Sequence, residues 1–175
     1  MIRTCPYPIL LGILCLLSFS ECSSKDGDPS AAVNPIPANS AAVKVDGVPF
    51  PISLATTGAV VDAKTGALRV GLGSSDARGP MVFFNLSEYR GRAEKIQLST
   101  NSGSQIMVIQ GQLVSGDGDY NTILCQTPVN HTFEVVEVNQ DKKTVSVKFS
   151  GTACGGGGKT KIVSEGQFNL PYTIR

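Results

Sequence analysis

Apolar and polar residues alternate in short runs along the chain from Ala42 onward, and turn residues separate these runs. In the run 67–72 every second residue is apolar, which is the pattern of a strand with one buried face. Its inward residues are expected to be Leu68, Val70 and Leu72. The run 81–86 is apolar on both faces, which predicts a central strand of a sheet. Long apolar stripes at helical spacing are missing from this part of the sequence.

Turn residues predict how these strands connect. Asp46-Gly47 between apolar neighbours is a strong hairpin signal. Gly66 closes the turn 64–66, where a positive φ is needed. We expect two further strand pairs, namely 95–98 with 105–110 across Asn101-Ser102-Gly103, and 133–138 with 145–149 across 139–143.

The last two strands show the clearest alternation. The residues expected to point inward are Val145, Val147 and Phe149 in one, and Ile162, Phe168 and Leu170 in the other. Taken together, the runs predict an all-β fold, either an antiparallel β-sandwich or a lipocalin-like barrel of roughly 8–10 short strands.

The N-terminal segment has a different pattern. Arg3 precedes the apolar run 9–17, which is shorter than the roughly 20 residues that a membrane-spanning helix needs. A basic start, a short apolar run and small residues are typical of an export signal. We therefore predict three parts, which are a lipoprotein signal peptide at 1–21, a flexible polar, proline-containing tether at 22–41, and a single β-rich domain at 42–175.

Two cleavage reactions remain open at the end of the signal. Cys22 resembles the lipidated cysteine of the bacterial lipobox, whereas Ser18 and Ser20 would suit an ordinary signal peptidase that cuts after Ser20 or nearby. The run Cys22 to Asp28 is similar to the start of mature lipoproteins in Bacteroidetes-type bacteria. This resemblance implies an anchor in the outer membrane, with the domain in the periplasm or exposed at the surface.

Charge and cysteine content narrow the possible partners. The net charge of +1 argues against a nucleic-acid partner, which requires a basic face. Of the five cysteines, Cys5 and Cys15 leave with the signal and Cys22 takes the lipid. The remaining pair, Cys125 and Cys154, is expected to form a disulfide in an oxidising compartment. Two free buried thiols and a metal site are the alternatives.

No motif develops into a catalytic or cofactor site. The run 153–160 fits a loose nucleotide-binding pattern, but a strand follows it instead of the helix that phosphate binding needs. The run 117–128 begins like a calcium loop and then fails the EF-hand pattern. His131, the single histidine, has no nucleophile motif near it, and Glu134 and Glu137 would share a face only across a bulge. We therefore predict no enzyme, no bound metal, no nucleotide and no cofactor.

A small basic cluster is the candidate contact surface. Arg90, Arg92 and Lys95 form this cluster next to Tyr89, and Tyr120 is a further candidate. Arginine and tyrosine bind anions and sugars well, so Tyr89, Arg90, Arg92 and Tyr120 are the possible ligand contacts. The alternative is an ordinary solvated turn.

Three short segments resemble a known family. Asp46-Gly47, residues 147–152 and residues 165–168 are similar to small Bacteroidetes-type lipoproteins of unknown activity, whose domain ends in a hairpin. The resemblance implies an all-β lipoprotein and transfers no site residues. We expect a lipid-anchored cell-envelope protein that acts as a non-catalytic binding module for a glycan or an envelope protein. The alternatives are a structural or accessory lipoprotein that acts through protein–protein contacts and, more remotely, a secreted hydrolase.

Overall fold

The computed structural model describes residues 35–175 apart from 77–78, 99–102, 111–118, 128 and 130. The described residues form eleven strands joined into one sheet. The strands are β1 (Ser40–Val45), β2 (Val48–Pro49), β3 (Gly58–Val61), β4 (Leu68–Gly73), β5 (Met81–Leu86), β6 (Glu94–Leu98), β7 (Gln105–Ile109), β8 (Asp119–Asn121), β9 (His131–Asn139), β10 (Thr144–Cys154) and β11 (Thr160–Ile174). Three short 3-10 helices are η1 (Leu54–Thr56), η2 (Thr122–Leu124) and η3 (Gly156–Gly158). The all-β prediction is confirmed.

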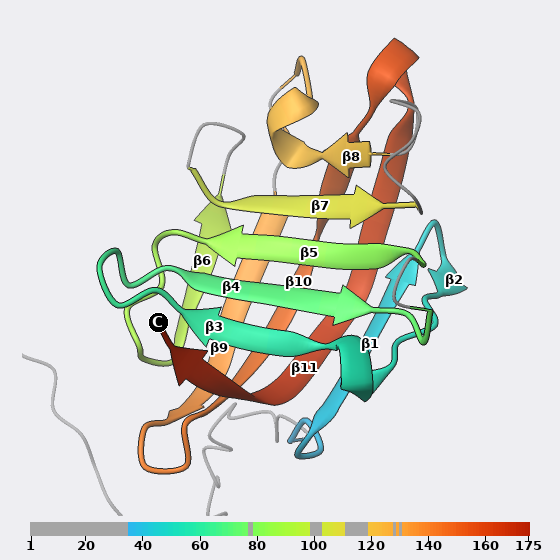
Figure 1. The fold of residues 1–175 in the computed structure, drawn as a ribbon. Coiled ribbons are helices and arrows are strands. Elements are labelled where there is room, and N and C mark those ends of the chain that lie inside the picture. Colours follow the sequence, from blue (N-terminus) through green and yellow to red (C-terminus); the bar gives the residue numbers. More distant parts are fainter. Residues whose placement is uncertain (1–34, 77–78, 99–102, 111–118, 128, 130) are drawn as a thin grey trace, which may run out of the picture. The chain divides into compact units, whose positions relative to one another are not determined.

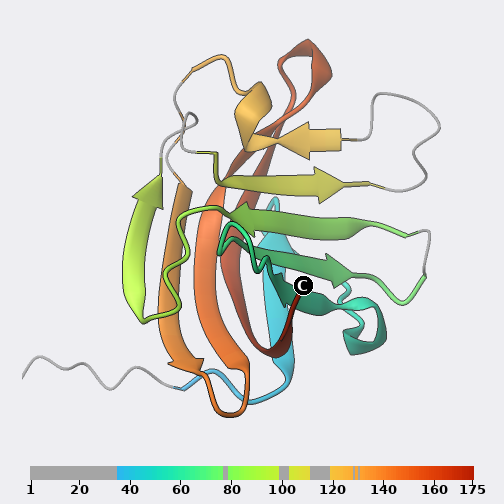
Figure 2. The ribbon, with the colours of Figure 1, turned by 60° about the vertical axis from the view of Figure 1, so that its left-hand side comes forward.

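The strands form two layers that cross steeply (Figures 1 and 2). The front layer is β3, β4, β5, β7 and β8, and the back layer is β6, β9, β10, β11 and β1. Strand β11 belongs to both layers, because its first part pairs with β1 and β10 while its end pairs with β3. The β11–β3 pairing is parallel, unlike the other pairings. A single bridge between Cys154 and Asn121 joins β10 to β8, so the pairings close into a ring like that of a barrel.

Aromatic side chains fill the space between the layers. Phe84 of the front layer has its ring centroid 5.4 Å from that of Phe133, 5.1 Å from that of Phe149 and 5.3 Å from that of Phe168. Burial of these large side chains contributes much of the hydrophobic driving force for folding. The residues predicted to point inward from β4 and β10 are all buried, as expected.

Three of the four hairpins that local turn signals predicted are present. Asp46 and Gly47 adopt positive φ values of 53° and 77° between β1 and β2. Gly66 has φ 73° in the turn from β3 to β4. The β9–β10 hairpin also forms as predicted.

The predicted pairing of 95–98 with 105–110 is wrong. Strand β6 pairs with β9, while β7 lies between β5 and β8. Each strand pairs where its inward residue meets the aromatic core, with Ile96 opposite Phe133 and Ile106 opposite Phe84. Turn residues show where a chain turns, whereas the burial of apolar faces decides which strand becomes the partner.

The predicted inward position of Ile162 is also wrong, because a bulge interrupts β11. Phe149 pairs with Gly166, but Gly151 pairs with Val163, so β11 has one extra residue at this point. Glu165 has φ 49° there. The extra residue reverses the alternation, so Val163 is buried while Ile162 is 57% exposed.

The described chain includes part of the segment that we assigned to the tether. Strand β1 begins at Ser40, and Ile36 is buried. Asn169 Nδ2 donates a hydrogen bond to the carbonyl oxygen of Ile36 at 3.1 Å, which fixes this segment against β11. The signal peptide, Cys22 and the tether up to residue 34 lie outside the described residues. Within the described ranges, no helix is long and apolar enough to cross a membrane.

The structure contains the disulfide that the cysteine count predicts. Cys125 and Cys154 are bonded, with their Cα atoms 5.0 Å apart. Cys125 follows η2 and Cys154 ends β10, so the bond lies beside the single bridge that joins β8 to β10. The covalent link therefore supports the pairing with the fewest backbone bridges in the ring.

Candidate functional site

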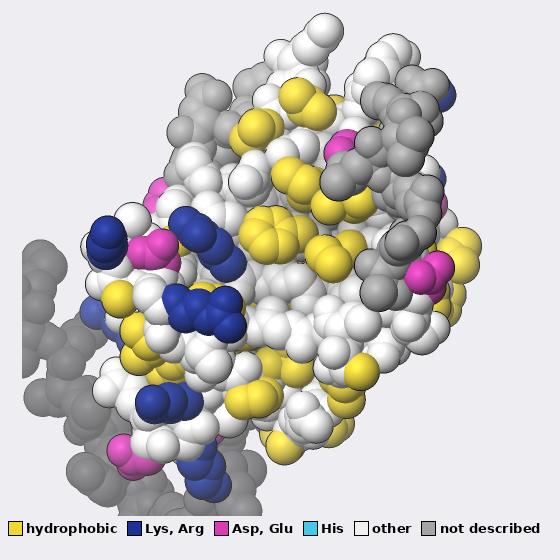
Figure 3. Space-filling view, in the orientation of Figure 1, with side chains coloured by type: hydrophobic (Ala, Val, Ile, Leu, Met, Phe, Trp, Pro, Cys, Tyr) yellow, Lys and Arg dark blue, Asp and Glu magenta, His cyan; other side chains and the backbone are white. Residues whose placement is uncertain are grey.

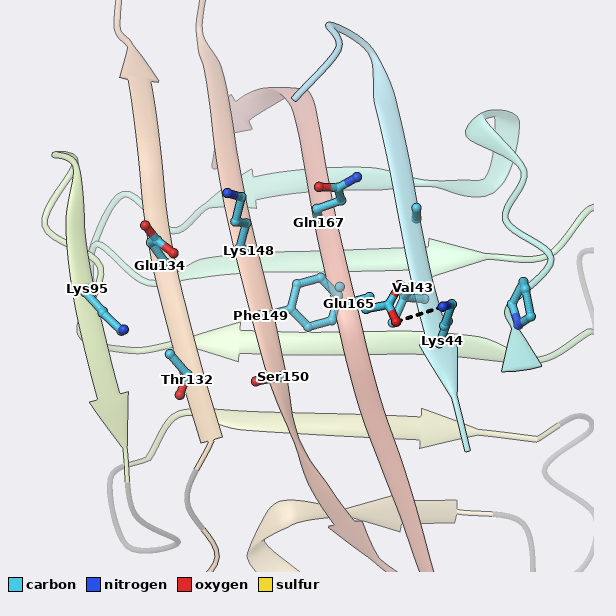
Figure 4. A pocket seen from close by; sticks show the side chains of 13 residues that line it. Val43, Lys44, Lys95, Thr132, Glu134, Lys148, Phe149, Ser150, Glu165 and Gln167 are labelled. Carbon is cyan, nitrogen blue, oxygen red and sulfur yellow. Dashed lines mark hydrogen bonds and ion pairs between the residues drawn. The ribbon is translucent and has the colours of Figure 1, made fainter. Parts of the chain in front are cut away.

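A groove of about 570 Å³ lies on the outer face of the back layer (Figure 4). We call it the polar groove, because polar side chains from β6, β9, β10 and β11 line it. Glu165 lies at its edge beside Lys44, and the other six are Lys95, Thr132, Glu134, Lys148, Ser150 and Gln167. They point outward because the residues between them, such as Val147 and Phe149, point into the core.

Four of these side chains form one row across the layer. Lys95 pairs with Glu134, Glu134 with Lys148, and Lys148 with Gln167. Figure 4 shows the row crossing the strands from β6 to β11. Cross-strand partners on one face have Cβ atoms about 5 Å apart. The row therefore offers an ammonium, a carboxylate, a second ammonium and an amide at regular spacing.

The charged groups of the row are not engaged with one another. In the described part of the chain, Lys95, Glu134 and Lys148 form no ion pair. At the edge of the groove, by contrast, Lys44 Nζ lies 2.7 Å from Glu165 Oε1 at the β11 bulge. The groove thus has one neutralised edge and a central row whose charges are available to a ligand.

Gly166 lies in the wall of the groove and packs against the core. A Cβ atom at this position would lie 2.6 Å from the ring of Phe149, which is too close for a real contact. Phe149 is held by the aromatic core and covers Gly166 from the inside. Glycine is therefore required here by the packing of the core.

The bulge that the pair Glu134 and Glu137 required is present. Glu137 pairs with Ser146 and Glu134 with Lys148, so β9 has one extra residue between them and both carboxylates face outward. Only Glu134 lines the polar groove.

The structure separates the four residues that the sequence suggested as ligand contacts. Tyr89 is 8% exposed and near Tyr172, and burial raises the pKa of its hydroxyl to about 12. Arg90 and Arg92 are on the surface, 3.9 Å and 3.7 Å from a carboxylate oxygen of Glu94.

Tyr120 lies in a different part of the fold. It is on β8, at the top of Figure 1, far from the segment after β5 that contains Tyr89. The residue is 6% exposed, and Lys161 Nζ lies 5.6 Å from the centroid of its ring. Lys161 also donates to Asp46 Oδ2 at 2.6 Å, and this hydrogen bond lowers the pKa of Asp46.

His131 is part of the core. It is 1% exposed, and its Nε2 lies 3.3 Å from the carbonyl oxygen of Ser104. Gly151 packs directly against it, since a Cβ at Gly151 would lie 2.6 Å from the His131 Cβ. Burial lowers the pKa of the imidazole. The neutral form is therefore the one that the folded protein favours.

This buried histidine predicts a pH-dependent stability. In the unfolded chain His131 takes up a proton below about pH 6.5, whereas the folded protein resists protonation, so the unfolded state binds more protons. The free energy of unfolding is expected to fall between about pH 7.5 and 5.5, by at most about 1.4 kcal/mol per pH unit. Urea unfolding across this range measures the slope. His131→Gln should flatten it, because the chain has no other histidine; equal slopes in both proteins would contradict this origin.

The nucleotide-like motif takes an ordinary structural role, whereas residues 117, 118 and 128 of the calcium-like run lie outside the described residues. The glycine-rich run 155–158 contains η3 and connects β10 to β11, so a strand follows it. Within the described ranges, no group of three histidine, cysteine or acidic side chains is close enough to hold a metal ion.

The outer face of the front layer has an exposed apolar patch (Figure 3). We define this apolar patch as Met81, Phe83, Met107 and Ile109, all half-buried. Phe83 pairs with Met107 and Met81 pairs with Ile109 across β5 and β7. The apolar character of run 81–86 on both faces was the sequence signal for this patch, and we interpreted it as a central strand.

The two surfaces arise from strands that are distant in the sequence. The alternation of Val147 and Phe149 implies that Lys148 faces outward, but it does not show that Thr132, Ser150 and Gln167 are its neighbours. Only the observed register brings them together. No family model, curated protein or solved structure matches the chain.

Proposed function

We propose that this chain is a lipid-anchored, non-catalytic protein of the cell envelope that binds a hydroxyl-rich glycan in the polar groove. The row Lys95, Glu134, Lys148 and Gln167 is the observation that carries the proposal. Regularly spaced polar groups that are not satisfied within the protein suit a ligand with its own regular array of hydroxyl groups.

The chemistry of the row fits both roles of a sugar hydroxyl. The lysine ammonium groups only donate hydrogen bonds, the Glu134 carboxylate only accepts them, and the Gln167 amide does both. Thr132 and Ser150 add hydroxyl groups beside the row. Lys95 and Lys148 outnumber Glu134, so we expect a glycan that includes acidic sugars to bind more tightly than a neutral one.

The sequence supports the location. An export signal that ends at Cys22 and a polar tether suit an outer-membrane lipoprotein, and the resemblance to Bacteroidetes-type lipoproteins agrees with this. A tethered domain would keep its groove free of the membrane surface.

Replacing Lys148 by Ala is expected to weaken glycan binding by at least about tenfold. A hydrogen bond to a charged group contributes roughly 1.5–3 kcal/mol, and 1.4 kcal/mol is tenfold in affinity. A glycan array would first identify a ligand, and isothermal titration would then compare Lys148→Ala with the unchanged protein.

Two variants make this comparison specific. Lys142→Ala removes an exposed lysine in the β9–β10 turn, away from the groove, and should bind normally. Arg90→Ala with Arg92→Ala tests the basic cluster. Loss of binding in this double variant, with normal binding by Lys148→Ala, would move the ligand out of the polar groove and contradict the proposal.

The apolar patch favours a second candidate function, in which the chain is an accessory protein that acts through protein–protein contacts. Contiguous apolar side chains on a soluble domain often mark such contacts. A pull-down of envelope proteins distinguishes the two functions. Protein–protein contact is favoured over glycan binding if the wild-type chain and Lys148→Ala retain an envelope protein that Phe83→Glu loses.

A further inference from the structure

The apolar patch has the composition of an interface core. Phenylalanine and methionine are enriched at the centres of protein–protein interfaces, and methionine adapts its shape to a partner. Met81, Phe83, Met107 and Ile109 form two adjacent cross-strand pairs, so the patch is continuous over β5 and β7. Nearby on η2, Ile123 and Leu124 are each 54% exposed.

Opposite charges lie at opposite corners of this patch. One row of outward residues crosses the front layer and consists of Gly71, Phe83, Met107 and Asn121. Arg69 lies on one side of this row on β4, and Asp119 lies on the other side on β8, because β4 and β8 run in opposite directions. Arg69 and Asp119 are both exposed, and Arg69 Nη2 also lies 3.3 Å from Asp62 Oδ2.

This arrangement is self-complementary. A twofold axis that lies in the plane of the contact and passes between Phe83 and Met107 brings Arg69 of one copy opposite Asp119 of the other. The twofold axis generates a second, equivalent contact between Arg69 and Asp119, so two ion pairs would flank an apolar centre. A patch that meets its own copy in this way forms a closed dimer.

We propose that the front layers of two copies of this chain pack face to face through the apolar patch. Two sheets that pack through their faces lie about 10 Å apart, which half-buried phenylalanine and methionine side chains can fill. A membrane surface is a poorer occupant, because Asp119 would face anionic lipid headgroups.

The dimer would place its two polar grooves on outward-facing sides, since each groove lies on the back layer. Two grooves on one particle would bind a polymeric ligand with greater avidity than a single groove. The dimer itself does not depend on the proposed glycan function, because its contact uses the other layer.

Cysteine crosslinking in the full-length, exported chain tests the dimer. Met107→Cys places a thiol beside the twofold axis, where it can meet the same residue of the second copy. Oxidation with copper phenanthroline is expected to give a dimer on a non-reducing gel. Thr132→Cys, in the polar groove, is the matched control and should remain a monomer.

Two additional variants test the chemistry of the contact. Adding Phe83→Glu to Met107→Cys should abolish the crosslink, because it buries two carboxylates at the apolar centre. Arg69→Asp and Asp119→Arg should each lower the crosslink yield, and their combination should restore it.

Three outcomes would overturn the proposal. The first is that Met107→Cys remains a monomer although its resistance to limited proteolysis shows that it is folded. The second is equal crosslinking of Thr132→Cys, and the third is a crosslink from Met107→Cys to a different protein instead of a second copy.

Discussion

Replacing Cys22 by Ser is expected to release the protein from the membrane fraction completely. Acyl chains contribute about 0.8 kcal/mol for each buried CH2 group, so the two or three chains of a lipoprotein anchor bind far more strongly than a peripheral surface contact. Cell fractionation of the unchanged chain and of Cys22→Ser measures the effect, and mass spectrometry of the mature N-terminus identifies the modified residue.

A second cysteine variant controls for general effects on export. Cys15→Ser alters the apolar run of the signal and should leave the anchored fraction unchanged. If an ordinary signal peptidase cuts near Ser20, the mature N-terminus will be unmodified and the unchanged chain will already be soluble. That result would contradict the lipid anchor.

Removing the disulfide is expected to cost roughly 3–4 kcal/mol of unfolding free energy in the chain-entropy model, for a sequence separation of 29 residues. The bond lies where β8 meets β10 through one bridge, so its loss also weakens the closure of the ring. Urea unfolding of the Cys125→Ser, Cys154→Ser double variant, compared with the oxidised chain, measures this difference.

A reducing agent provides the control for this experiment. It should destabilise the unchanged domain by a similar amount and leave the double variant unaffected. Equal stability of the oxidised chain and the double variant would show that the bond adds nothing to the fold.

Features set by neighbouring residues could be predicted from the sequence. Asp46-Gly47 forms its hairpin turn because both positions need positive φ, and aspartate and glycine tolerate this conformation. The inward residues of β4 follow directly from the alternation of Leu68, Val70 and Leu72. The disulfide followed from the cysteine count once the signal peptide was set aside.

Features that depend on distant segments could not be predicted. The pairing of β6 with β9 and the closure of β11 onto β3 depend on where the inward faces meet. The polar groove is a product of that register, so its row of side chains is not recognisable in the sequence. The bulge at Glu165 had one signal, since glycine at position 166 inside a strand often accompanies a bulge.

The two tyrosines show the same limit for the candidate site. The sequence predicts that Tyr89 and Tyr120 are exposed contact residues, because each is next to polar or charged residues. In the fold both rings contribute to the core. Neighbours in the sequence indicate the local polarity, whereas the burial of a side chain depends on the layer of strands that packs against it.

Amide chemical-shift mapping tests most directly whether the polar groove is the binding surface. The isotope-labelled mature protein would be titrated with the glycan selected on the array. We predict that the perturbed amides cluster on β6, β9, β10 and β11 around Lys95, Glu134, Lys148 and Gln167. Perturbations that cluster at Arg90 and Arg92 or on the apolar patch, or none at saturating glycan, would contradict the account.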